Sequence, residues 1–152
     1  MDTGKNGRNI IANHMADMAM HKSIIFPTAT NLTCTIAAHD DADTWSAWVE
    51  VVDSGATSLS TLVAALPGHI ERMWVSAGNQ ASTTYMSELA YGEAKVNLGN
   101  NRVVTGTANL PVFNQVELHG PKIPAGETIY ARVMCKTAGA KTLTVGFSVY
   151  NA

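Results

Sequence analysis

Residues 129–149, which read IYARVMCKTAGAKTLTVGFSV, decide the fold class of this chain. Apolar residues occupy every second position of two runs, first Ile129, Ala131, Val133 and Cys135 and then Leu143, Val145, Phe147 and Val149. Alternation with a period of two is typical of strands that are buried on one face. Ala138-Gly139-Ala140 separates the two runs and has the composition of a short turn. The segment therefore predicts two amphipathic strands joined as a hairpin.

The chain from about Thr30 onward repeats these signals. Further strands are predicted in or near residues 30–38, 45–52, 69–77, 82–91, 95–98, 102–104 and 112–118. Gly99-Asn100-Asn101 is interpreted as a tight hairpin turn, and Pro124-Ala125-Gly126 as a turn before the next strand. Roughly nine or ten short strands at regular spacing, with no convincing helical pattern among them, predict an antiparallel β-sandwich, specifically a jelly roll, over residues 24–152.

Residues 1–23 differ from the rest and are interpreted as an N-terminal arm. They open with Gly and Asn residues, and Ile11, Met15 and Met18 then recur at helical spacing. An arm that is extended or forms a short helix, and that docks on a neighbouring molecule, is the expectation. Its apolar anchors would be Ile10, Ile11, Met15 and Met18.

The composition excludes some partners. Charged residues make up 14% of the chain, against about 25% in a typical soluble domain, and the net charge is −2. Because the chain has no basic excess, nucleic-acid binding is not expected. The uncharged stretches fall short of a membrane-spanning helix, and the N-terminus lacks the pattern of a signal peptide. Small neutral side chains must cover much of the surface, which fits two classes equally well: a protein that packs against other proteins, and a secreted β domain.

The two cysteines, Cys34 and Cys135, fall on inward strand positions. Free buried thiols in a protein made in a reducing cytosol are the favoured interpretation. A bridge between adjacent strands stays open as the alternative.

No motif predicts catalysis or a cofactor. The glycine-rich nucleotide signatures and the G-x-S-x-G elbow are absent from the sequence. The cluster Asp40-Asp41-Ala42-Asp43 lacks the later ligands of a calcium loop and is interpreted as a solvated loop. The histidines are not spaced as a metal pair. We therefore expect no enzyme activity, no metal and no cofactor.

Aromatic residues are the candidates for partner contacts. By strand alternation, Trp48, Tyr130 and Tyr150 face outward, where they can fill a partner's pocket or be covered by the arm or a second sheet. Trp45 falls on the inward set of its strand and is predicted to lie in the core.

The stretch Lys122-Ile123-Pro124-Ala125-Gly126-Glu127, the following alternating strand with Arg132, the glycine turn and the final strand ending near Tyr150 resemble small β-sandwich virion proteins of tailed bacteriophages. Trp48-Val49-Glu50-Val51 and the Ser/Thr/Ala-rich segment after it fit the same resemblance, which covers roughly Ser46 to Ala152. It implies a structural role, most plainly that of a capsid decoration protein, and offers no catalytic residues to carry over.

This resemblance implies a homotrimer that binds the major capsid protein on the outer shell of the head after synthesis in the bacterial cytoplasm. Each copy would contribute a neutral surface and an arm, and symmetry would multiply them into high avidity. The alternative function is a phage tail or baseplate module that recognises a carbohydrate receptor. That alternative predicts aromatic and carboxylate side chains together, for example Trp48 or Tyr130 near Asp41.

Overall fold

The computed structural model describes residues 23–108 and 115–151, and in them the chain is all-β. The strands are β1 (Ser23–Phe26), β2 (Cys34–Ala37), β3 (Val49–Glu50), β4 (Gly68–Gly78), β5 (Thr84–Tyr91), β6 (Val96–Val104), β7 (Gln115–Glu117), β8 (Ile129–Cys135) and β9 (Thr142–Asn151). One short 3-10 helix, η1 (Leu59–Val63), lies between β3 and β4.

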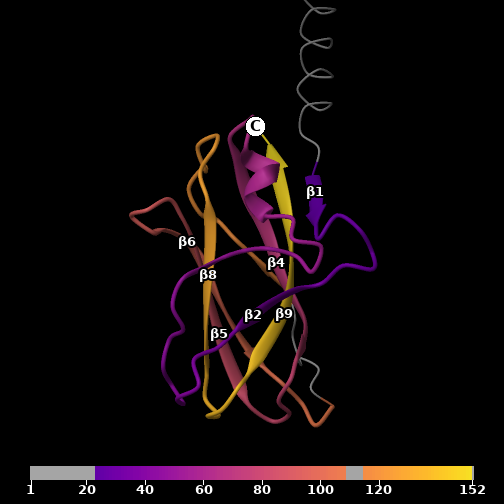
Figure 1. Ribbon diagram of the computed structural model, residues 1–152, viewed down its shortest axis with the longest axis vertical. Coiled ribbons are helices and arrows are strands. Elements are labelled where there is room, and N and C mark those ends of the chain that lie inside the picture. Colours follow the sequence, from indigo (N-terminus) through magenta and orange to yellow (C-terminus); the bar gives the residue numbers. More distant parts are fainter. Residues whose placement is uncertain (1–22, 109–114, 152) are drawn as a thin grey trace, which may run out of the picture.

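The strands form two antiparallel sheets packed face to face (Figure 1). Sheet A has the order β1-β9-β4-β7, with β2 pairing the same side of β9 further along that strand, and sheet B has the order β3-β8-β5-β6. Early strands pair with late ones: β1 and β2 with β9, β3 with β8, β4 with β7 and β5 with β6. This order is that of a jelly roll, and it confirms the predicted fold class.

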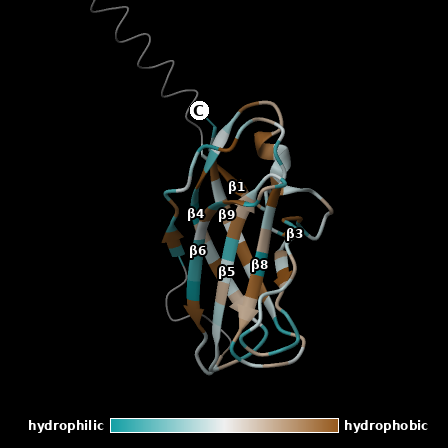
Figure 2. Ribbon diagram, turned by 90° about the vertical axis from the view of Figure 1, so that its left-hand side faces the viewer, coloured by the Kyte–Doolittle hydropathy of each residue, from teal (hydrophilic) through white to brown (hydrophobic). Residues whose placement is uncertain are grey.

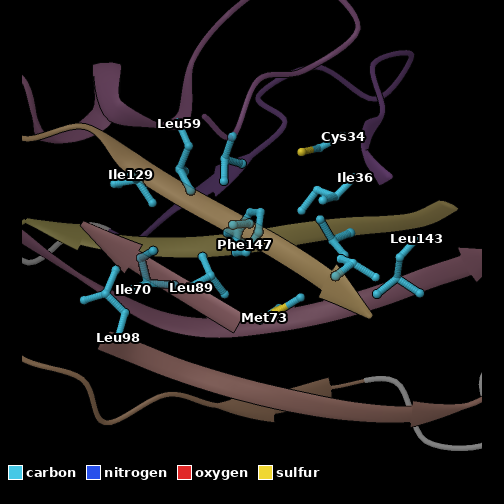
Figure 3. Packing of buried hydrophobic residues seen from close by; sticks show 14 of the residues in the cluster. Cys34, Ile36, Leu59, Ile70, Met73, Leu89, Leu98, Ile129, Leu143 and Phe147 are labelled. Atoms are coloured by element: carbon cyan, nitrogen blue, oxygen red, sulfur yellow. The ribbon is translucent and has the colours of Figure 1, made fainter. Parts of the chain in front are cut away.

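The hairpin predicted for residues 129–149 is wrong, although both strands exist. β8 lies in sheet B and β9 in sheet A, so the turn at Gly139 carries the chain from one sheet to the other. Alternation indicates only that one face of each strand is buried. Two strands that face one core from opposite sheets show the same alternation as two paired neighbours. Ile129 and Phe147 both point into the shared core, from opposite sheets (Figure 3).

The tight hairpin predicted at Gly99-Asn100-Asn101 is also wrong, because β6 runs through these residues without a break. The hairpin between β5 and β6 turns at Gly92 instead, whose φ is +71°, and the amide of Lys95 donates to the Gly92 carbonyl oxygen at 3.2 Å. Gly99, with φ +147°, lies where the β5–β6 register shifts. It is a bulge glycine rather than a turn glycine.

Two elements were not expected from the sequence. The apolar run at residues 62–66 begins inside the 3-10 helix η1. Ser58 caps this helix, and its hydroxyl oxygen accepts a hydrogen bond from the Ser60 amide at 3.1 Å. β1 begins at Ser23, so the sandwich includes the residue that was predicted to end the arm. A four-residue strand is too short to show a period of two.

The core between the sheets contains Phe147 near its centre, with Phe26, Met73, Leu89 and Leu143 among the fully buried residues (Figure 3). Cys34 and Cys135 are buried and free, as favoured from the sequence. Burial, and secondarily the negative charge of Asp53, raises the pKa of Cys34 to about 12. This thiol is therefore protonated at neutral pH.

Candidate interaction surfaces

The outward aromatic residues lie at separate places. Trp48 and Tyr130 are half-buried near or on the outer face of sheet B, and Tyr150 is half-buried on sheet A with its ring 6.1 Å from that of His69. Trp45, predicted to be core, is also only half-buried. Its segment is irregular before β3, so strand alternation does not set its direction.

A cluster around Arg132, here called the Arg132 cluster, joins β5, β8 and the segment before β3. Glu88 and Arg132 are register partners on β5 and β8, and Figure 2 shows hydrophilic stretches of these two strands side by side. The guanidinium of Arg132 binds the Glu88 carboxylate through Nε at 2.7 Å and Nη2 at 2.6 Å. The guanidinium carbon also lies 4.8 Å from the ring centre of Trp45 and 4.5 Å from that of Trp48.

These contacts hold the irregular segment against sheet B. The amides of Asp43, Ser46 and Val51 donate to carbonyl oxygens of β8 at 2.9, 3.0 and 3.1 Å. Two cation–π contacts and a charge-assisted ion pair then fix the indoles over the same strand. The Asn97 side-chain amide donates to the other Glu88 oxygen at 2.8 Å. Arg132 and Glu88 therefore stabilise this face through contacts that they already make within the chain.

The outer face of sheet A carries a groove with a volume of about 470 Å³, here called the Trp74 groove. One wall is the β1–β2 loop, which bulges away from the sheet before the chain returns to β2 (Figure 1). Trp74 and Ser76 of β4 and Thr144 to Gly146 of β9 complete it. The described residues that line it are Ile25, Pro27, Thr28, Ala29, Thr30, Leu32, Thr33, Trp74, Ser76, Thr144, Val145 and Gly146, and none of these is ionisable. Ile25 and Trp74 also line an adjoining hollow that contains Glu71 and Arg72.

A glycine shapes the floor of this groove. Gly146 is the register partner of Trp74, and a Cβ atom at position 146 would collide with the indole. The absence of a side chain thus lets the indole lie directly on β9. Trp74 was not singled out from the sequence because the periodicity of residues 69–77 is ambiguous, and β4 indeed has register shifts between Ile70 and Arg72 and between Val75 and Ala77. The one sequence signal for this groove was Gly146, a glycine at an outward position in the interior of a predicted strand.

The aspartate loop is exposed, as predicted, and its amide at Asp41 donates to His39 Nδ1 at 3.0 Å. The carboxylate that shares Arg132 with Trp48 is that of Glu88. Asp41, the carboxylate expected near Trp48 or Tyr130, lies in the exposed loop, with Oδ2 3.7 Å from His39 Nδ1. Within residues 23–108 and 115–151, no three side chains of His, Cys, Asp or Glu form a metal-binding group. In the same ranges, no helix has the length and hydropathy needed to cross a membrane.

The predicted arm anchors Ile10, Ile11, Met15 and Met18 lie outside the described residues. Comparison of the sequence with protein-family models gives no match, and comparison with curated proteins gives no significant match.

Proposed function

We propose that this chain is a virion structural protein, a capsid decoration protein that binds the outer shell of a tailed-phage head as a homo-oligomer. The observation that carries the proposal is the uncharged Trp74 groove, beside the strand at which residues 1–22 join the sandwich. Neutral small side chains lose little hydration free energy when a partner covers them. Such a face suits extensive packing against the major capsid protein or another copy.

The resemblance to phage virion proteins supports the same proposal. Jelly rolls occur in viral capsid domains and also in lectins, so the fold agrees with both candidate functions and does not decide between them.

The Arg132 cluster bears on the alternative, carbohydrate recognition. Two indoles and the Glu88 carboxylate all contact Arg132 there, and aromatic and carboxylate side chains are the groups that this function uses. Both indoles already stack on the guanidinium, however, and both oxygens of Glu88 already accept hydrogen bonds. We therefore favour capsid decoration over sugar binding.

Removing residues 1–22 should abolish binding to heads and leave the sandwich folded. The deletion must stop before Ser23, because this residue begins β1 and its hydroxyl donates to Glu71 Oε2 at 3.3 Å. Full-length and shortened proteins would be compared by co-sedimentation with purified heads of the phage that encodes the chain, and by thermal denaturation. The expected result is loss of co-sedimentation with a retained cooperative transition.

A matched pair of full-length variants tests whether head binding depends on the apolar side chains of the arm or only on the arm's length. In one variant serine replaces the anchors Ile10, Ile11, Met15 and Met18; in the control it replaces the polar residues Asn6, Asn9, Asn13 and Asp17. The first variant should no longer sediment with heads, and the control should do so like the full-length protein. Binding of the shortened protein at the full-length stoichiometry would contradict the role of the arm.

A further inference from the structure

We infer that the Trp74 groove binds the apolar residues of segment 1–22 from a second copy of this chain. The inference rests on the proposed function and names the neighbour on which the arm docks. It combines the chemistry of the groove, the composition of the N-terminal segment and the direction of β1.

The described residues that line the groove present apolar surface and carry no charge. Ile25, on its β1 wall, is 59% exposed, and the Trp74 indole is half-buried on the glycine floor. Thr144 and Ser76 supply neutral polar groups, and the Ser76 hydroxyl donates to the Thr144 carbonyl oxygen at 3.3 Å. An occupant of this groove should therefore be apolar, uncharged and narrow.

The N-terminal segment has this composition. Between Asn9 and His21 its single formal charge is Asp17, and Ile, Met and Ala make up most of the remainder. Methionine side chains adapt to irregular surfaces, as a groove between a loop and a sheet requires. Fully extended, residues 1–22 would span up to about 75 Å, so they can reach a neighbouring molecule.

The direction of β1 favours a second copy over the same molecule. Ser23 pairs with Tyr150, at the end of β9 away from the groove, and β1 then runs toward the groove. A segment that precedes Ser23 must reverse direction to lie in its own groove. Met20-His21-Lys22 has no glycine, proline, asparagine or aspartate to make such a turn. The groove of a neighbouring molecule requires no reversal.

Each copy would give one segment and receive another. An interface of this head-to-tail kind closes into a ring when the rotation between neighbouring copies closes, and a trimer is one such ring. Exchange of N-terminal segments would thus hold a homo-oligomer together without requiring a large flat interface between the sandwiches.

Cross-linking distinguishes the possible occupants of the Trp74 groove. Two full-length single variants, Met15→Cys and Ser76→Cys, would be mixed and oxidised mildly. In the control, Val104→Cys replaces Ser76→Cys, because Val104 is exposed on β6 of the opposite sheet. A disulfide-linked dimer that forms with Ser76→Cys and not with Val104→Cys is the expected result. The natural cysteines are buried and should not take part.

Sedimentation of two charge variants adds a second readout. Ser76→Glu places a carboxylate in the groove and should convert the oligomer to monomer, whereas Val104→Glu should leave the oligomer unchanged. A monomeric full-length protein would overturn the inference. So would a bond formed solely within the chain of a Met15→Cys/Ser76→Cys double variant, or a Ser76→Cys bond solely to a head protein.

Co-sedimentation of the same proteins with heads distinguishes a failure of the groove inference from a failure of the proposed function. Full-length protein that binds heads without the intermolecular cross-link would overturn the groove inference and leave the proposed function standing. A cross-linked oligomer that does not bind heads would support the groove inference and contradict capsid decoration.

Discussion

Arg132→Ala is expected to lower the free energy of unfolding by about 3 kcal/mol, because the substitution leaves Glu88 without its cationic partner. The side chains of Arg132 and Glu88 are 28% and 19% exposed, so solvent compensates only part of the loss. The contacts with Trp45 and Trp48 are lost as well, and each is worth about 0.5–1 kcal/mol. Urea unfolding followed by circular dichroism measures the change.

Arg102→Ala is the matched control, because Arg102 is exposed on the neighbouring strand β6. Its effect should stay within about 0.5 kcal/mol. The double variant Arg132→Ala/Glu88→Ala removes both charges, so its destabilisation should be smaller than the sum of the two single changes. A loss below about 1 kcal/mol for Arg132→Ala would show that the cluster does not hold the segment before β3.

Strand positions and core residues were largely predictable because burial on one face leaves a period of two. Residues 129–135 alternate strictly between buried and half-buried positions, as the sequence predicted. The jelly-roll class followed from the number and spacing of such segments. Trp45 shows the limit of this reasoning: its segment runs beside β8 without being a regular strand, so alternation gave it the wrong direction.

Sheet membership was not predictable from local pattern. The turn at Gly139 links the two sheets, while the turn at Gly92 makes a true hairpin, and both are glycines with positive φ. Which of them joins paired strands depends on contacts between residues that are distant in sequence. The Trp74 groove was missed for the same reason, since its walls come from β1, β4 and β9 and the β1–β2 loop.

Two glycines show most clearly that local sequence pattern does not reveal contacts between the sheets. Gly99 was predicted to form a turn, yet a Cβ atom there would meet Leu118 Cδ2 at 2.6 Å. Gly120 lies against the backbone of Leu98 in the same region. Leu118 and Gly120 follow β7 of sheet A, whereas Leu98 and Gly99 belong to β6 of sheet B. The two glycines therefore allow the sheets to close at this side of the sandwich, a role that no local pattern reveals.

Gly120→Ala should consequently lower the free energy of unfolding by about 3 kcal/mol, through overpacking that the structure cannot easily relieve. The new Cβ atom would collide with the carbonyl oxygen of Leu98 and lie 2.8 Å from its Cα atom. These are backbone atoms of a strand paired with β5, so no rotamer change removes the clash. The chain after β7 would have to move away from β6 and expose Leu118, which is 8% exposed. Thermal and urea unfolding measure the loss.

Three comparisons test whether the clash with the Leu98 backbone causes the loss of stability. Gly126→Ala has open space around its Cβ atom and a φ of +81°, so it should cost only the left-handed backbone strain of about 1–2 kcal/mol. Leu98→Ala should not rescue Gly120→Ala, because it leaves the Leu98 backbone in place. Gly99→Ala should instead be partly rescued by Leu118→Ala, since its clash is with a side-chain methyl group. Rescue of Gly120→Ala by Leu98→Ala, or a cost no greater than that of Gly126→Ala, would contradict the backbone contact as the means by which the sheets close here.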